Sequence, residues 1–195
     1  MKKLILALIL LTGLFLSSIT SFAHCDTKDG PVVAAAIKAI EQNNINFALI
    51  WIQPAQEKEI KEAFESVMKV RVLSAEAQKL ADNYFYETLV RLHRIGEEMP
   101  YTGVKPAGTP IDEKILAADK SIAAGNLSPL NNLVPKARQA ELKKRFDKVM
   151  SLKQYDINDV EGGRKYVEAY VQFFHFAEGE EKHHPVHKEK AGHKM

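Results

Sequence analysis

The amino-acid sequence predicts an all-α protein, a helical bundle built from two pseudo-symmetric repeats. Three observations lead to this prediction. Apolar residues recur with helical spacing in both halves of the chain, the sequence aligns with itself at an offset of 82 residues, and no clear strand pattern remains. We expect residues 24–98 to form the first repeat, 99–110 a linker and 111–178 the second repeat, all within one compact domain.

The chain opens with the features of a signal peptide. Two lysines precede an apolar run over residues 4–16, and Ser21 and Ala23 place small residues three and one positions before the expected cleavage site. About 13 apolar residues are too few to cross a bilayer. We therefore expect residues 1–23 to be removed, which leaves a periplasmic or secreted protein that starts at His24 and has no membrane partner.

Removal of the signal peptide changes the charge of the chain. The full sequence has 27 basic and 25 acidic residues, and the signal peptide contains two of the basic residues and none of the acidic ones. The mature chain is therefore balanced, with 25 residues of each sign and neutral histidines. This balance gives no reason to expect a nucleic acid as a partner.

Three helices are expected in the first repeat. Pro31 suits the opening position of a helix that ends near Asn43, Pro54 opens the second helix, and Ser74 caps the third. The side chains expected to form the buried faces of these helices are Val33, Ala36, Ile37, Ile40, Ile60, Ala63, Phe64, Val67, Met68, Ala77, Leu80, Ala81, Tyr84, Phe85, Thr88, Leu89 and Leu92.

The second repeat follows a linker that contains three prolines and two glycines within residues 99–110. Helices are expected from about 111 to 125, from 135 to 152 and from 159 to 177. The one ambiguous segment is the apolar stretch 47–52, which has the length of a strand. Its counterpart in the second repeat contains a proline, which argues against a strand.

The internal repeat depends on matched positions. Nine residues between positions 37 and 71 are identical to those 82 positions later, without a gap. The same offset pairs Tyr84 with Tyr166 and His93 with His175. One register that persists over this length favours a duplication.

The mature N-terminus is the first candidate metal site. A free His24 offers its α-amine and ring nitrogen to one ion, and Cys25 adds a thiolate and a backbone nitrogen, a donor set suited to square-planar Cu or Ni. Cys25 is the single cysteine, so it has no partner for an internal disulfide. Asp29-Gly30-Pro31 supplies a stiff turn, so we expect the segment to fold back against the bundle. The alternative is that cleavage exposes an arbitrary residue.

The matched histidines are the second candidate. In a duplicated fold, His93 and His175 are related by a pseudo-twofold axis and can meet at a shared site. Glu168 or Glu87 is placed to orient a ligating imidazole. The alternatives are two histidines that are hydrogen-bonded in the core or at its rim, or a histidine that donates a proton near neutral pH.

The C-terminal residues 179–195 contain four of the seven histidines and only two large apolar residues. This composition cannot form a core, and we expect a disordered tail. His183, His184, His187 and His193 could bind Cu, Ni or Zn weakly, or the tail is simply solvated.

The opening His-Cys-Asp resembles the N-terminal hook of nickel superoxide dismutases, which reads His-Cys-Asp-x-Pro-Cys-Gly-x-Tyr on a helical bundle. In that family the N-terminal amine and ring, a backbone nitrogen and two thiolates hold the nickel. The resemblance implies ligand roles for His24 and Cys25. Asp29 stands in place of the second thiolate, and Lys28 and Val32 replace the proline and the tyrosine. Dismutase activity is therefore not implied, and Asp29 is at most a weaker ligand.

Over most of its mature length the chain resembles an uncharacterised family of small exported bacterial proteins. These proteins begin His-Cys-Asp-x-x-Asp-Gly-Pro-Val and carry Tyr-Phe-x-Glu-Thr-Leu-Val-Arg-Leu-His followed by Pro-Tyr-Thr-Gly. The corresponding residues are 24–33, 84–93 and 100–103. This resemblance implies no particular activity.

The leading hypothesis is an exported metalloprotein with Cu or Ni at His24 and Cys25, completed by His93 and His175, with redox chemistry possible. The alternative is a non-catalytic helical module that binds a partner protein or buffers metal. The sequence leaves open whether the protein is an enzyme.

Overall fold

The structure is a computed structural model that describes residues 23–179. The expected signal peptide up to residue 22 and the expected tail from residue 180 lie outside the described residues. Within the described range the chain is helical, and its one β feature is an isolated parallel bridge between Thr27 and Lys105. The predicted all-α fold is therefore confirmed. The helices are α2 (Ala23–Asp26), α3 (Pro31–Glu41), α4 (Asn46–Leu49), α5 (Glu57–Val70), α6 (Ala75–Gly96), α7 (Glu113–Ala124), α8 (Gln139–Leu152) and α9 (Val160–Glu178).

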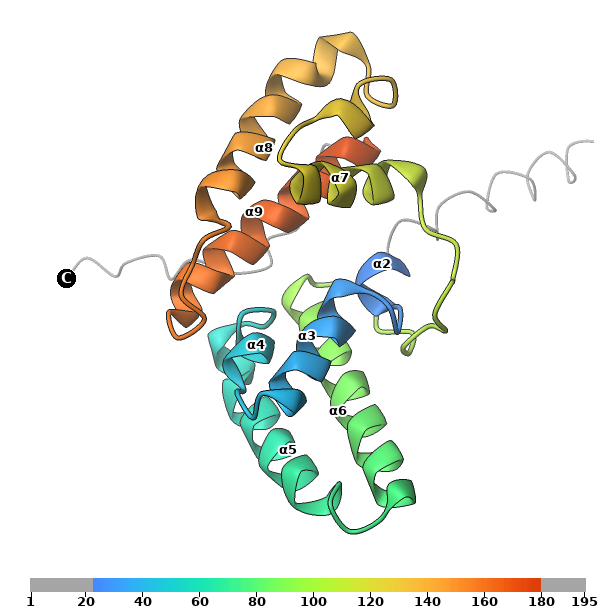
Figure 1. The fold of residues 1–195 in the computed structure, drawn as a ribbon, viewed down its shortest axis with the longest axis vertical. Coiled ribbons are helices and arrows are strands. Elements are labelled where there is room, and N and C mark those ends of the chain that lie inside the picture. The colour runs from blue at the N-terminus through green and yellow to red at the C-terminus, as the bar shows by residue number, and fades with distance from the viewer. Residues whose placement is uncertain (1–22, 180–195) are drawn as a thin grey trace, which may run out of the picture.

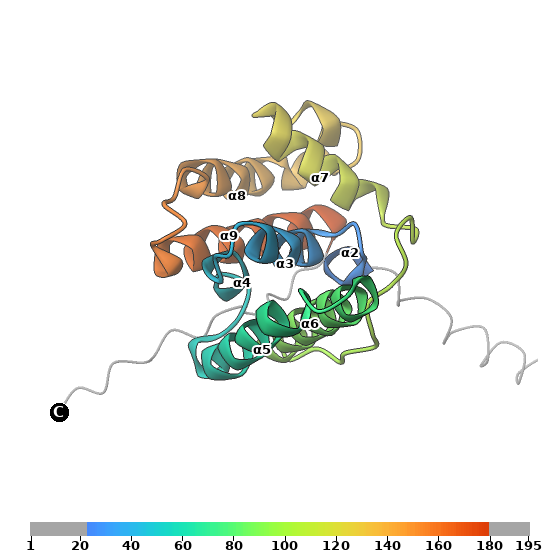
Figure 2. The same cartoon turned by 60° about the horizontal axis from the view of Figure 1, so that its bottom comes forward.

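The helices form two groups that face each other. Helices α3 to α6 lie on one side of the molecule and α7 to α9 on the other (Figure 1). In the turned view α3 and α9 lie in the middle, with α8 on one outer side and α5 on the other (Figure 2). The segment between α6 and α7 passes near the short helix α2 as it joins the two groups.

The boundaries of the elements recur at the offset found in the sequence. Helix α3 starts at residue 31 and α7 at 113, and α5 spans 57–70 where α8 spans 139–152. The short 3₁₀ turns before α5 and α8, Pro54–Gln56 and Lys136–Arg138, are also 82 residues apart. The order of elements is thus the same in both halves, although a duplication as their origin stays a prediction.

The cap predicted at Ser74 is confirmed, and a second side-chain cap lies at the predicted start of the last helix. The Ser74 side chain accepts a hydrogen bond from the backbone of Ala77, and Asp159 does the same for Gly162. The sequence predicts that Pro54 opens an α-helix. Instead, Pro54 starts a 3₁₀ turn, and α5 begins three residues later. This turn is held because the backbone of Gln53 donates to the Gln56 side chain.

Two side chains expected in the core are exposed instead. Leu80 and Tyr84 are 71% and 57% exposed, whereas Ala81 and Phe85, one position further along α6, are buried. The apolar stripe of α6 is wide enough to allow either flank to face inward, and packing against α3 and α5 selects the flank with Ala81 and Phe85.

The ambiguous segment 47–52 is helical at first and then forms a buried turn. Ile50, Trp51 and Ile52 are at most 6% exposed because they pack between the two halves. The buried Arg164 of α9 donates to the carbonyl of Ile52 and pairs with Glu57. This turn therefore fixes the two halves against each other.

Candidate functional site

The N-terminal segment folds back against the bundle, as its Asp-Gly-Pro turn predicts. His24, Cys25, Asp26 and Thr27 are all at most 5% exposed. Lys105 of the linker donates its backbone N–H to Asp26 and accepts one from Lys28. A side chain at Gly30 would lie 2.1 Å from the His24 carbonyl oxygen, so only glycine permits this close turn.

A buried ion-pair network joins this segment to α6. Arg94 donates to Asp26 and to Glu97, in both cases at a distance of 2.7 Å. All three residues are at most 3% exposed. Burial alone raises the pKa of Glu97, but His93, Arg94 and His175 outweigh this effect and hold the pKa below its usual range. Glu97 is therefore an ionised carboxylate in the core.

His93 faces Glu97 with an unpaired nitrogen. The ring is fully buried, and its Nδ1 lies 2.9 Å from the Trp51 carbonyl oxygen. Because a carbonyl can only accept, Nδ1 carries the proton, and a neutral ring presents a lone pair at Nε2. Burial lowers the pKa of His93, which favours the neutral ring.

When the His93 ring is neutral, two acceptor atoms face each other in the core. His93 Nε2 is 3.4 Å from Glu97 Oε1, and neither atom has a hydrogen-bond partner in the described part of the chain. Buried polar atoms are nearly always satisfied, and two lone pairs at this distance repel unless a proton or a metal cation lies between them. Two ligands bound at about 2.1 Å would be separated by about 3.4 Å at a tetrahedral angle and by about 3.0 Å at the square-planar angle of Cu and Ni, so the two atoms would approach each other to bind either ion in square-planar geometry.

Cys25 and His175 belong to the same surroundings. Burial raises the pKa of the Cys25 thiol well above its usual value, and the carboxylates of Glu97 and Asp26 raise it further, so the thiol is protonated. His175 of α9 is 8% exposed, with Nδ1 3.5 Å from Glu178, and it contributes to the lowered pKa of Glu97. Three of the four predicted ligands, Cys25, His93 and His175, thus interact electrostatically with one buried carboxylate, that of Glu97. We call these residues, with Asp26, Arg94 and Glu97, the buried polar centre.

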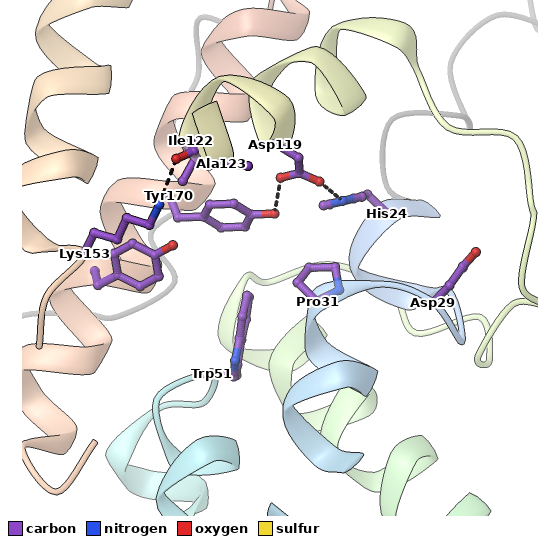
Figure 3. A pocket seen from close by; sticks show the side chains of 10 residues that line it. His24, Asp29, Pro31, Trp51, Asp119, Ile122, Ala123, Lys153 and Tyr170 are labelled. Atoms are coloured by element: carbon purple, nitrogen blue, oxygen red, sulfur yellow. Dashed lines mark hydrogen bonds and ion pairs between the residues drawn. The ribbon is translucent and has the colours of Figure 1, made fainter. Parts of the chain in front are cut away.

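The His24 side chain points away from this centre, toward α7. Its Nε2 lies 2.8 Å from Asp119, whose other carboxylate oxygen accepts the hydroxyl of Tyr170 at 2.7 Å (Figure 3). His24 Nδ1 is buried and has no hydrogen-bond partner among residues 23–179. Both His24 and His93 therefore have one nitrogen held by an acceptor and the other unpaired, the pattern of a ligating imidazole.

The remaining predicted residues are placed differently. Asp29 is exposed and accepts the backbone N–H of Gly108. Glu87 accepts from the backbone of Val104, and Glu168 accepts from Gln172. Instead, the Trp51 carbonyl and Asp119 orient the histidines. The tail histidines His183, His184, His187 and His193 lie outside the described residues.

Sequence reasoning missed Glu97, Arg94, Asp26 and Asp119. Only Glu97 carried a usable signal, because it follows His93 by four residues on one face of α6. Within residues 23–179, no three His, Cys, Asp or Glu side chains are arranged to hold a metal ion. The ligand roles of His24, Cys25, His93 and His175 therefore stay predictions. In the same range, no helix has the length and apolar character that a membrane span requires.

The fold and the site define an all-α protein of two facing helical groups with a buried polar centre between them. Residues 29–176 match the model of a family of unknown function (DUF6448), and the chain belongs to this family. No curated protein and no solved structure matches the chain. The family match begins after His24 and Cys25, so it does not test the N-terminal motif.

Proposed function

We propose that this chain is an exported protein that binds one Cu or Ni ion in the buried polar centre. The observation that carries the proposal is the pair of unpaired buried acceptors, His93 Nε2 and Glu97 Oε1, 3.4 Å apart. The Trp51 carbonyl fixes the ring so that Nε2 is the coordinating nitrogen. Export rests on the features of residues 1–23.

Cys25 supplies the third ligand in this proposal, as a thiolate. Without metal the thiol keeps its proton, because burial and nearby carboxylates raise its pKa. An ion that binds here displaces that proton, so binding is linked to proton release and strengthens as the pH rises. His175 is the candidate for a fourth ligand. Because three ligands are not assembled among the described residues, Cys25 or His175 must move toward the ion.

The N-terminal chelate is a second candidate for the location of the ion. Cleavage after Ala23 would create an α-amine next to the buried, unpaired Nδ1 of His24, while Asp119 holds the opposite ring nitrogen. An amine and an imidazole from one residue form a compact chelate for Cu or Ni. This candidate requires cleavage, because an uncleaved chain has an amide at that position.

Metal content decides between these possibilities. The test uses untagged mature protein in which the four tail histidines are replaced by serine, dialysed after equilibration with Cu or Ni. We expect one ion per chain in this protein and none in His93→Gln or Glu97→Gln. His175→Gln should retain some metal, but less than one ion per chain. Loss only when one residue is added ahead of His24 would assign the ion to the N-terminal chelate.

A protein that retains no stoichiometric metal in any of these forms contradicts the proposal. The alternative of a non-catalytic helical module that binds a protein partner would then be favoured. Circular dichroism of each variant separates the loss of a ligand from the loss of the fold.

A further inference from the structure

A cavity of about 430 Å³ opens between the two helical groups, next to His24. Both halves of the chain contribute to its walls, which include Pro31 and Trp51 from the first half and Asp119, Tyr166 and Tyr170 from the second. Figure 3 shows the labelled side chains around a central space, with Trp51 on one side and Asp119 on the other. The volume is at the lower end of the range for small-molecule sites, so a ligand would be small.

The walls are mainly aromatic. The rings of Trp51 and Tyr170 are nearly perpendicular, with centroids 6.1 Å apart, and Tyr166 stacks on Tyr170 at 6.2 Å. Such a set offers both ring faces and ring edges to a further aromatic ring. Pro31, Ile122 and Ala123 complete the apolar lining.

Asp119 is a polar group of the lining that a ligand can reach. Its side chain is 36% exposed, whereas those of His24 and Tyr170 are largely covered. Each Asp119 oxygen accepts one hydrogen bond, from Tyr170 or from His24, and each retains further acceptor capacity. The ligand group that contacts Asp119 must therefore be a donor, not an acceptor.

The charges around the cavity also favour a ligand that carries a donor. Asp119 and Asp29 are carboxylates, while the Lys153 ammonium is directed to the Ile122 carbonyl oxygen, 2.8 Å away. An anionic ligand would face Asp119 without a donor to offer it. Like charges that face each other at close range are unfavourable.

We propose that this cavity binds a small aromatic molecule that carries a hydrogen-bond donor, either a phenol or an aromatic ammonium. The ring lies against Trp51 and Tyr166, and the donor reaches Asp119. This site does not depend on an ion bound between His93 and Glu97, because none of its ligand contacts involves His93, Glu97 or Cys25.

Trp51 makes the proposal measurable, because it is the only tryptophan in the chain. The mature protein is titrated with p-cresol, phenethylamine and phenylacetate while Trp51 fluorescence is excited at a wavelength where the probes do not absorb. We expect a saturable change with p-cresol or phenethylamine, and at least tenfold weaker binding of phenylacetate. Preference for phenethylamine would assign a larger part of the recognition to the charge of Asp119, and equal binding would assign it to the hydrogen bond.

Two variants show whether the probe occupies this cavity. Ala123→Phe places a ring in the cavity and should weaken binding by more than tenfold. Ala124→Phe, at the neighbouring exposed position outside the lining, should leave binding within about twofold of wild type. Three results would each overturn the proposal. They are no saturable response to either p-cresol or phenethylamine, binding of phenylacetate as tight as that of the other probes, and equal effects of the two variants.

Discussion

At the residue scale, the arrangement of charges around Arg94 shows how the centre is held. Arg94 is 2% exposed, and its guanidinium donates to two carboxylates, one from the N-terminal segment and one at the C-terminal end of its own helix. Asp26, Arg94 and Glu97 together leave one excess negative charge in the core. A buried excess charge is costly, and a proton on the centre or a bound cation removes it. The same charge balance that holds the segment therefore favours a cation.

Replacing Arg94 tests this dependence. Arg94→Met leaves Asp26 and Glu97 buried without their partner and should lower the free energy of unfolding by about 3–5 kcal/mol, measured by urea denaturation. Lys58→Met breaks an ion pair whose side chains are 87% and 67% exposed, and should change the same quantity by no more than about 0.5 kcal/mol. Equal effects of the two substitutions would mean that the buried network does not stabilise the fold.

The tyrosines that line the cavity predict a loss of stability in alkali. Burial raises the pKa of Tyr166 to about 12 and raises that of Tyr170 well above its ordinary value. In the unfolded chain both ionise near 10. The folded state therefore holds more protons than the unfolded state above pH 10. Its stability is fully present below pH 10 and falls as the pH rises toward 12 and beyond.

Absorbance at 295 nm follows this titration directly. In the folded protein, part of the tyrosinate signal should appear only near pH 12 or above. In urea-unfolded protein, the control, the whole signal should appear near pH 10. Identical titration curves in the two states would show that these tyrosines are not buried.

At the element scale, the turn after α4 and the start of α9 determine how the halves meet. A Cβ at Gly163 would lie 2.4 Å from a methyl carbon of Ile50, so glycine is required for this approach. We expect Gly163→Ala to lower the free energy of unfolding by about 1–3 kcal/mol through overpacking. In an Ile50→Ala background, which removes that methyl group, the added cost should be smaller.

The control for this pair is Lys165→Ala, at an exposed position of the same helix, with an expected change of no more than about 0.5 kcal/mol. A double-mutant cycle measured by urea denaturation gives the coupling between Gly163 and Ile50. Additive effects would show that the two residues do not meet.

The helices could be predicted from the sequence more accurately than the residues of the site. The cap at Ser74 could be predicted from the sequence because it acts through a local hydrogen bond. The inward flank of α6 was misjudged at Leu80 and Tyr84, because the choice depends on neighbouring helices. Asp119 was missed because its role depends on a contact with His24, 95 residues away in the chain.

At the scale of the whole molecule, the buried residues of both halves form one continuous core. Trp51 lies where the halves meet and contacts His93 of α6 and Tyr170 of α9. The shared core predicts that neither half unfolds separately. The matching spacing of their elements supports the proposed duplication, which the sequence alone also predicts.

Unfolding in urea followed by two signals tests this cooperativity. Trp51 fluorescence reports the contact between the halves, and far-ultraviolet circular dichroism reports all helices. We expect one midpoint for both signals. A fluorescence transition that precedes the loss of helix would contradict it, because the halves would then separate before they unfold.

The most direct test of the central claim is an anaerobic titration of the mature protein with Ni(II). The tail histidines are replaced by serine, and thiolate-to-nickel charge-transfer absorption in the near ultraviolet is followed. We predict a band that saturates at one nickel per chain and that is absent in Cys25→Ser and in His93→Gln. The absence of a saturating band in the wild-type centre, or an unchanged band in His93→Gln, would contradict metal binding between the two halves.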